Sequence, residues 1–202
     1  LLKRLVFPNS NRYFLIYEAM RKGATVEEIH ELTKIKAYFL EQIKELVDEE
    51  EALVKNAGSV PADDALIQAK KDGFSDKYLG QILQVPEADI RNRRIELGME
   101  ENWEGVHVSG TKDNAYYYST YNGTDKNPVS DGKQKIMILG GGPNRIGQGI
   151  EFDYCCVHAS LALKKLGFET IIVNCNPETV STDYDTSDKL YFEPLTLEDV
   201  LS

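Results

Sequence analysis

The stretch KIMILGGGPNRIGQG, residues 135–149, decides the fold of the last third of the chain. Its first five residues form an apolar run typical of a buried strand, and a glycine-rich turn follows. A helical pattern then runs to Gly167, and the apolar run TIIVN at 170–174 predicts a second strand. This order of elements predicts a βαβ unit of a parallel, Rossmann-like sheet.

The two ends of the chain indicate a piece of something longer. A third strand is expected at 189–192, and Thr196 is expected to cap a helix after it. A doubly wound sheet needs more strands than these, so we expect the α/β part to be truncated at the C-terminus. Residues 1–8 carry neither a start methionine nor a signal-peptide pattern, so we expect the chain to begin inside a longer polypeptide.

Upstream of this unit, residues 11–98 have the pattern of an all-α domain. Apolar residues recur at helical spacing along one face of 35–51, and Thr25 to Glu28 form a capping box. Pro61 and Pro86 fit the first turns of further helices. The acidic run 48–51 is interpreted as a solvated helix face.

The helical part contains a faint internal repeat with a spacing of fifty residues. Each copy has a glycine, a capping residue, a short helix, a turn and a second helix. Two such hairpins packed face to face would bury both apolar stripes. The matching residues are Gly23, Thr25, Ile29, Leu32 and Ile35 in one copy, and Gly73, Ser75, Leu79, Ile82 and Val85 in the other.

Between the two parts lies a segment without clear periodicity. The tyrosine cluster Tyr116, Tyr117, Tyr118 and Tyr121 has strand or loop character and is interpreted as a packing patch. The stretch after it is rich in Gly, Asp, Asn, Ser and Pro, as linkers are. We therefore divide the chain into a helical domain at 1–121, a linker at 122–133 and a βαβ unit at 134–202.

Composition narrows the possible partners and the compartment. The net charge of −10 disfavours binding to nucleic acid or to an anionic membrane, both of which need clustered Lys and Arg. No stretch approaches the length of a transmembrane helix. The three cysteines do not form a disulfide framework, which favours a reducing, cytoplasmic location.

The glycine-rich segment is the first candidate site. Gly140, Gly141, Gly142 and Gly147 permit close approach of a ligand to the backbone, and Arg145 adds a cationic fork for an anion. The spacing departs from the dinucleotide fingerprint GxGxxG, and no Walker lysine is present. From spacing alone, an anion or nucleotide-phosphate loop and a purely structural glycine turn both remain open.

The second candidate is the polar segment 174–185, which follows the second strand at the carboxyl edge of the sheet, where open α/β sheets bind ligands. It predicts a lined cavity, and a solvated loop is the alternative. Asn174 stands where a dinucleotide-binding unit would carry an acidic residue, which weakens the hypothesis of a dinucleotide enzyme. His158 and Cys155 share a helix face but are too few for a metal site, so we expect both to be buried for structural reasons.

At this point the sequence resembles a known family. GGGPNRIGQGIEFDY at 140–154 and NPETVSTDYDTSD at 176–188 closely resemble the start of the second synthetase half of the carbamoyl-phosphate synthetase large subunit of bacterial type. LTKIKAYFLEQIKELV, DGFSDKYLGQI and YYYSTY resemble the oligomerisation domain that precedes that half. The segment 106–112, VHVSGTK, departs from the family pattern, so no family role is carried over to it.

The resemblance implies a ligase that makes carbamoyl phosphate from bicarbonate, glutamine-derived ammonia and two ATP. The βαβ unit would be the pre-ATP-grasp domain of the half that phosphorylates carbamate, with Arg145, Gly149 and Glu178 near the end of the carbamate passage. ATP and Mg²⁺ (or Mn²⁺) would act in the intact enzyme, but the family's ATP-grasp lysines and metal-binding carboxylates are not in this sequence. We therefore expect no catalytic residue, no bound cofactor and no activity in the isolated chain.

The resemblance also implies partners, namely the remainder of the large subunit, a glutaminase small subunit and further copies joined through the helical domain. Whether the product would serve arginine or pyrimidine synthesis stays open. One alternative is a non-catalytic helical scaffold. Another is a helix-turn-helix DNA-binding module at 73–98, with Arg91, Arg93 and Arg94 on its second helix.

Overall fold

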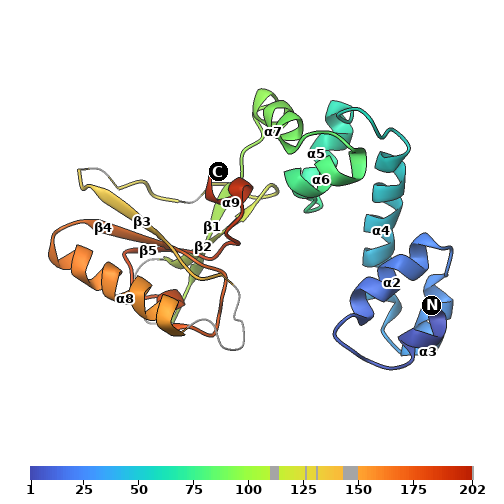
Figure 1. Cartoon of the computed structure of the whole chain (residues 1–202), viewed down its shortest axis with the longest axis horizontal. Coiled ribbons are helices and arrows are strands. Elements are labelled where there is room, and N and C mark those ends of the chain that lie inside the picture. Colours follow the sequence, from blue (N-terminus) through green and yellow to red (C-terminus); the bar gives the residue numbers. More distant parts are fainter. Residues whose placement is uncertain (110–113, 126, 131, 143–149, 202) are drawn as a thin grey trace. The chain divides into compact units, whose positions relative to one another are not determined.

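The computed structural model describes residues 1–109, 114–125, 127–130, 132–142 and 150–201. The chain forms two compact units, Leu1–Leu97 and Gly98–Ser202, called here the helical unit and the sheet unit. Figure 1 shows helices throughout the first and a sheet with a long helix in the second. This confirms the predicted fold class of an all-α part followed by an α/β parallel-sheet part.

The described helices of the helical unit follow one another with short connections, as they do in Figure 1. They are α1 Leu2–Leu5, α2 Arg12–Arg21, α3 Val26–Thr33, α4 Ala37–Val54, α5 Asp63–Lys71, α6 Asp76–Leu83 and α7 Glu87–Glu96.

The internal repeat is confirmed, and it covers three helices in each copy. α2, α3 and α4 correspond to α5, α6 and α7, and the capping residues Thr25 and Ser75 each accept a hydrogen bond from the backbone three residues on. Lys34 and Gln84, also fifty residues apart, both have a φ of 59°. The two copies thus share their turns as well as their helix starts.

The two copies do not bury a common face, so the predicted face-to-face packing is wrong. The first copy has its own core around Ile29 and Leu40, and the second has another around Leu79 and Ile90. α4 is long enough to serve both, with Val47 in the first core and Leu53 in the second. This longer helix, rather than a shared stripe, connects the two cores.

Two local predictions in this unit need correction, although Asp48 of the acidic run is exposed as expected. Glu50, in the acidic run interpreted as solvated, is only 1% exposed because hydroxyl and guanidinium groups surround it. Pro61 lies two residues before α5, and Pro86 is the N-cap of α7. Both prolines precede their helices, where their fixed φ and missing N–H cost nothing.

The sheet unit has the described strand order β1-β2-β5-β4-β3. β2, β5, β4 and β3 are parallel neighbours, and β1 pairs with β2 in the antiparallel sense. The elements are β1 Asn102–His107, β2 Asn114–Thr120, β3 Lys135–Leu139, α8 Ile150–Lys165, β4 Glu169–Val173, the 3₁₀ turn η1 Val180–Thr182, β5 Lys189–Tyr191 and α9 Leu197–Val200. Thr196 caps α9 as predicted.

The tyrosine segment is part of this sheet. Tyr117 is opposite Tyr191 in the register of β2 with β5, and the two rings lie 5.6 Å apart. Trp103 of β1 packs on the same Tyr191 ring at 4.7 Å. These contacts confirm a packing role for Tyr117, and they place the division between the compact units after Leu97 rather than in the predicted linker.

α8 lies along one face of the sheet, against β3 and β4 (Figure 1). Its inward residues include Asp153, Cys156 and Ser160, so Cys155 and His158 are exposed, and the prediction that both are buried is wrong. β4 is buried, but β3 alternates between exposed and half-buried residues because it is the last strand of the sheet. In the described part of the chain, no helix is both long and apolar enough to cross a membrane.

Candidate functional site

The two candidate segments leave the sheet side by side. β3 and β4 are parallel and in register from Lys135↔Glu169 to Leu139↔Val173, so Gly140 and Asn174 emerge at the same edge. The Gly140 N–H donates to the Val173 carbonyl at 2.8 Å, which extends the pairing by one step. Both candidate segments therefore begin at the carboxyl edge of the sheet, as predicted for the segment 174–185.

Asn174 joins the two segments. Its side chain is 2% exposed, and its Oδ1 accepts hydrogen bonds from the Gly142 N–H at 3.2 Å and from the Cys175 N–H at 3.0 Å. Its Nδ2 donates to Ser181 Oγ at 3.0 Å. The amide thus uses both its acceptor and its donor to hold backbone and side chain on either side.

Gly140 is required by the same contact. A Cβ at this position would lie 2.5 Å from Asn174 Cγ, closer than real Cβ contacts. The glycine therefore lets a buried amide side chain pack against the backbone that leaves β3.

The loop after β4 is held by its own polar side chains. Asn176 is buried, and its Oδ1 accepts from the Glu178 N–H at 3.0 Å. Thr182 Oγ1 donates to the Asn176 carbonyl at 2.7 Å. These bonds fix the backbone of Glu178 while its side chain stays exposed at the rim.

α8 holds the same loop from the other side. The Asp153 carboxylate accepts from the Ser181 N–H at 3.1 Å and 3.3 Å, and Ser160 Oγ donates to the Thr186 carbonyl at 2.9 Å. Burial, with the negative charge of Asp153, raises the pKa of the Cys156 thiol, which therefore stays neutral and weakly nucleophilic. We assign Cys156 to packing.

Only some of the predicted site residues lie in the part of the chain that the structure describes. Gly140, Gly141 and Gly142 directly follow β3, and Glu178 is exposed on the neighbouring loop. Arg145, Gly147 and Gly149 lie outside the described residues. Sequence reasoning missed the positions that hold the loops, Asp153 and Ser181, and interpreted Asn174 only as a missing acid.

Within the residues that the structure describes, no three His, Cys, Asp or Glu side chains are grouped as a metal ion would require. The edge therefore presents amide and hydroxyl groups that fix two loops, with the exposed carboxylate of Glu178 beside them.

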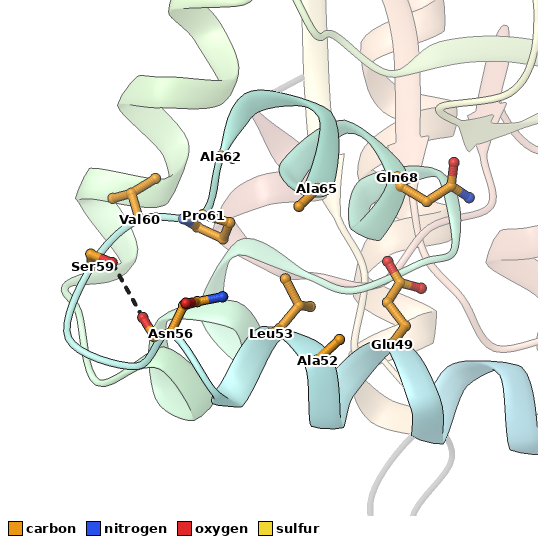
Figure 2. A pocket seen from close by; sticks show the side chains of 10 residues that line it. All are labelled: Glu49, Ala52, Leu53, Asn56, Ser59, Val60, Pro61, Ala62, Ala65 and Gln68. Atoms are coloured by element: carbon orange, nitrogen blue, oxygen red, sulfur yellow. Dashed lines mark hydrogen bonds between the residues drawn. The ribbon is translucent and has the colours of Figure 1, made fainter.

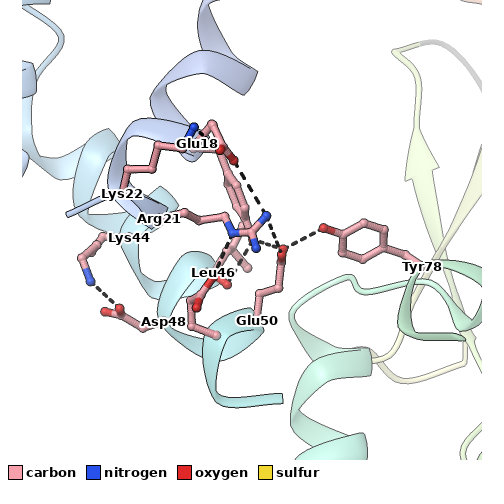
Figure 3. A network of polar contacts seen from close by, with 10 residues as sticks. Glu18, Arg21, Lys22, Lys44, Leu46, Asp48, Glu50 and Tyr78 are labelled. Carbon is pink, nitrogen blue, oxygen red and sulfur yellow. Dashed lines mark hydrogen bonds and ion pairs between the residues drawn. The ribbon is translucent and has the colours of Figure 1, made fainter. Parts of the chain in front are cut away.

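The helical unit contains a buried polar network around Glu50 (Figure 3). Glu50 Oε2 accepts hydrogen bonds from Tyr17 Oη at 2.5 Å and from Tyr78 Oη at 2.7 Å, and Arg21 lies 3.5 Å from Oε1. Burial and these bonds to a carboxylate raise the pKa of Tyr17, and that of Tyr78 to about 12. One carboxylate thus connects α2 of the first copy with α6 of the second.

A second buried cluster lies inside the second copy. Asp76 is fully buried, with Lys70 Nζ 2.9 Å from one oxygen and Arg94 Nε 3.1 Å from the other. The first copy has Met20, Val26 and Lys44 at the matching positions. Paired charges of this kind are expensive to break, because removal of one partner leaves the others buried.

An open pocket of about 690 Å³ lies between the end of α4, the loop 56–62 and α5 (Figure 2). Its lining is mostly alkyl, with Glu49 and Gln68 at one end. Burial and a hydrogen bond to Asp72 raise the pKa of Glu49 from its ordinary value of 4.5 to about 7. Near neutral pH the pocket therefore has one carboxyl group that exchanges its proton.

The arginines of the helix-turn-helix alternative are engaged in ion pairs within the helical unit. Arg91 pairs with Glu87 at 3.0 Å, Arg93 binds Asp63 at 2.7 Å, and Arg94 is buried against Asp76. A recognition helix needs such side chains free to reach phosphates and base edges. This arrangement disfavours the DNA-binding hypothesis.

Comparison with known proteins covers both units. Residues 1–98 match a family model described as the carbamoyl-phosphate synthetase large chain, oligomerisation domain. Residues 132–202 match one described as the carbamoyl phosphate synthase preATP-grasp domain. The two matches follow each other along the chain, one on the helical unit and one on the sheet unit.

Relatives of high identity carry the same name. The chain is 52% identical to a carbamoyl phosphate synthase large chain of Haemophilus ducreyi over 203 residues, covering 98% of this chain and 19% of the relative. It is 54% identical to that of Pasteurella multocida over 197 residues (96% and 18%). It is 50% identical to an arginine-specific, chloroplastic large chain of Arabidopsis thaliana over 198 residues (96% and 17%).

The chain therefore spans about a fifth of the length of the curated relatives it matches. Identity of this level over nearly all of the chain, together with two consecutive domain matches, indicates common descent with these large chains. The chain belongs to the carbamoyl-phosphate synthetase large-chain family.

Proposed function

We propose that this chain is part of an ATP-dependent ligase that makes carbamoyl phosphate from bicarbonate, ammonia released from glutamine, and two ATP. The observation that carries the proposal is the pair of domain matches in consecutive order, with about 52% identity to large chains along the whole sequence. The enzyme would work in the cytoplasm with a glutaminase subunit and the rest of the large chain.

Within that enzyme the two units have different tasks. The helical unit supports assembly with the rest of the large chain and with further copies. The sheet unit belongs to the half that phosphorylates carbamate, and Arg145, Gly149 and Glu178 lie near the end of the carbamate passage. A cation there would stabilise an anionic intermediate, and a carboxylate would orient it.

ATP and Mg²⁺ (or Mn²⁺) are the cofactors of the whole enzyme in this proposal. Phosphoryl transfer needs a metal ion and positioned cations around the phosphates. The described residues offer no metal-binding group, so we assign none of them to the metal. We expect the isolated chain to be inactive, because the family's ATP-grasp lysines and metal-binding carboxylates are not among its residues.

The passage is tested in the whole synthetase by Glu178→Gln. We expect less carbamoyl phosphate per ATP hydrolysed, because carbamate that is held less well decomposes in water before it is phosphorylated. Asp185→Asn, which removes another exposed carboxylate of the same loop, is the matched control and should leave that ratio unchanged. Equal ratios in Glu178→Gln and the parent enzyme would remove Glu178 from the proposal.

The alternative of a non-catalytic scaffold is tested with the whole native polypeptide that contains this sequence. Incubation with bicarbonate, glutamine, ATP and Mg²⁺ should yield carbamoyl phosphate, whereas the purified 202-residue chain should yield none and should still self-associate in sedimentation. A native polypeptide that self-associates but forms no product would favour the scaffold.

A further inference from the structure

Among the described side chains at the carboxyl edge, Asn174 forms hydrogen bonds with both candidate segments, and no proposed role accounts for it. It accepts from the Gly142 N–H at 3.2 Å on the segment after β3, and it donates to Ser181 Oγ at 3.0 Å on the loop after β4. At 2% exposure it faces inward, between the segments, and away from any ligand in solvent.

The chemistry of this position requires an amide. The carbonyl oxygen takes two backbone N–H groups, from Gly142 and Cys175, while the NH₂ group serves a hydroxyl. An aspartate could accept but not donate, and it would place a charge in a buried site. An apolar residue of the same size would leave the buried Gly142 N–H without its acceptor.

The residues next to Asn174 leave room for its side chain and hold its hydrogen-bond partner in place. Gly140 has no Cβ, and one would lie 2.5 Å from Asn174 Cγ. Ser181 is itself fully buried and is held from α8 through its N–H to the Asp153 carboxylate. The hydrogen bonds of Asn174 and Ser181 therefore connect the ends of β3 and β4 with α8, where both segments begin.

We propose that Asn174 is a positioning residue, which fixes the segment after β3 relative to the loop of Glu178 and so keeps the carbamate passage aligned. The effect on carbamate rests on the proposed function, whereas the anchoring of the two segments rests on the hydrogen bonds of Asn174 alone. Displacement of either segment by about 1 Å is enough to lower the efficiency of a transfer step strongly.

The test uses the whole synthetase with Asn174→Ala and two readouts. The first is amide hydrogen exchange at Gly142 and Cys175, which should become about tenfold faster at both sites because both N–H groups lose the Asn174 Oδ1 as their acceptor. The second is carbamoyl phosphate formed per ATP hydrolysed, which should fall about tenfold while bicarbonate-dependent ATP hydrolysis stays within about twofold of the parent.

Two further variants separate positioning from general damage. Gly140→Ala places a methyl group against the Asn174 side chain, and it should likewise speed up hydrogen exchange and lower the carbamoyl phosphate formed per ATP hydrolysed. Thr186→Val removes a hydroxyl that bonds only within its own loop, to the Val180 carbonyl at 2.8 Å, and should leave the product ratio unchanged. Ser181→Ala, which removes one bond of Asn174, should show a smaller effect and replaces Asn174→Ala if that variant does not fold.

The outcomes distinguish the two proposals. If the parent enzyme makes no carbamoyl phosphate, the proposed function fails, while hydrogen exchange still decides whether Asn174 anchors both segments. If the parent makes it and Asn174→Ala has an unchanged product ratio, the positioning role is overturned. An equal fall of ATP hydrolysis and product formation would indicate a merely structural residue and would also overturn it.

Discussion

At the scale of single residues, Glu49 makes the stability of the helical unit depend on pH. Burial and its hydrogen bond to Asp72 raise its pKa from 4.5 to about 7, so the folded chain holds this proton more tightly than the unfolded chain. The resulting stabilisation is complete below pH 4.5 and is lost as the pH rises through 7.

Glu49→Gln should remove this dependence, because the amide is neutral at every pH. The variant should be more stable than the parent at pH 8 by on the order of 1 kcal/mol, since solvent screening reduces the effect of a partly exposed group. Urea unfolding of the chain at low and high pH measures this, with exposed Glu41→Gln as control. A difference that is the same at both pH values would contradict it.

The candidate site could be predicted from single residues only in part. The glycines after β3 stand out by their composition and spacing, and the polar loop after β4 by its place at the carboxyl edge, where open α/β sheets bind ligands. Asp153 and Ser181 do not stand out, since their contact joins residues 28 positions apart and neither has a local signal. Whether Asn174 faces a ligand or the protein interior depends on packing, which its position after a strand does not reveal.

At the scale of elements, the repeat predicts paired effects of paired substitutions. Lys34 and Gln84 each follow a short helix with a φ of 59°, a left-handed conformation that favours glycine. Lys34→Gly and Gln84→Gly should therefore each stabilise the chain by up to about 1 kcal/mol in thermal or urea unfolding. Lys36→Gly, at a φ of −57°, has no such strain to relieve and should not stabilise.

Glu50 connects the two copies of the repeat and should be costly to remove. Glu50→Ala removes a buried carboxylate that accepts hydrogen bonds from Tyr17 and Tyr78, so a loss of about 1.5–3 kcal/mol in unfolding free energy is expected. Glu51→Ala is a close control, because Glu51 also pairs with Arg21 but is 44% exposed, and it should cost less than about 1 kcal/mol. Similar losses for both would show that Glu50 does not couple the copies.

The same helices show why element-level prediction succeeded locally and failed globally. Capping residues and turns are encoded within a few positions, so the repeat and the starts of α3 and α6 were visible in the sequence. The partner of each apolar stripe is not encoded locally. The length of α4 lets each copy close its own core, and it also brings Glu50 of an acidic run into the interior.

At the scale of the whole molecule, the sequence predicted the two classes of structure but not the division between them. The predicted division rested on a composition change at 122–133, whereas the compact units meet between Leu97 and Gly98. The reason is strand pairing over a long separation, since Tyr117 of β2 is opposite Tyr191 of β5. Such pairing has no local signature, and tyrosines fit strands and loops alike.

Whole-molecule charge gives a prediction that tests the DNA-binding alternative. The chain has a net charge of −10, and Arg91, Arg93 and Arg94 are engaged with carboxylates of the helical unit. Binding to duplex DNA would have to overcome repulsion between like charges and the loss of these ion pairs.

At a salt concentration of about 0.15 M, the purified chain should therefore not shift duplex DNA in a gel, even at a protein concentration of about 100 µM. Asp63→Asn with Glu96→Gln removes the acceptors of Arg93 and lowers the negative charge, so it is the variant most disposed to bind. A shift by the parent chain that weakens with salt and disappears in Arg91→Ala with Arg93→Ala would contradict the prediction, because only those guanidinium groups would then account for phosphate contact.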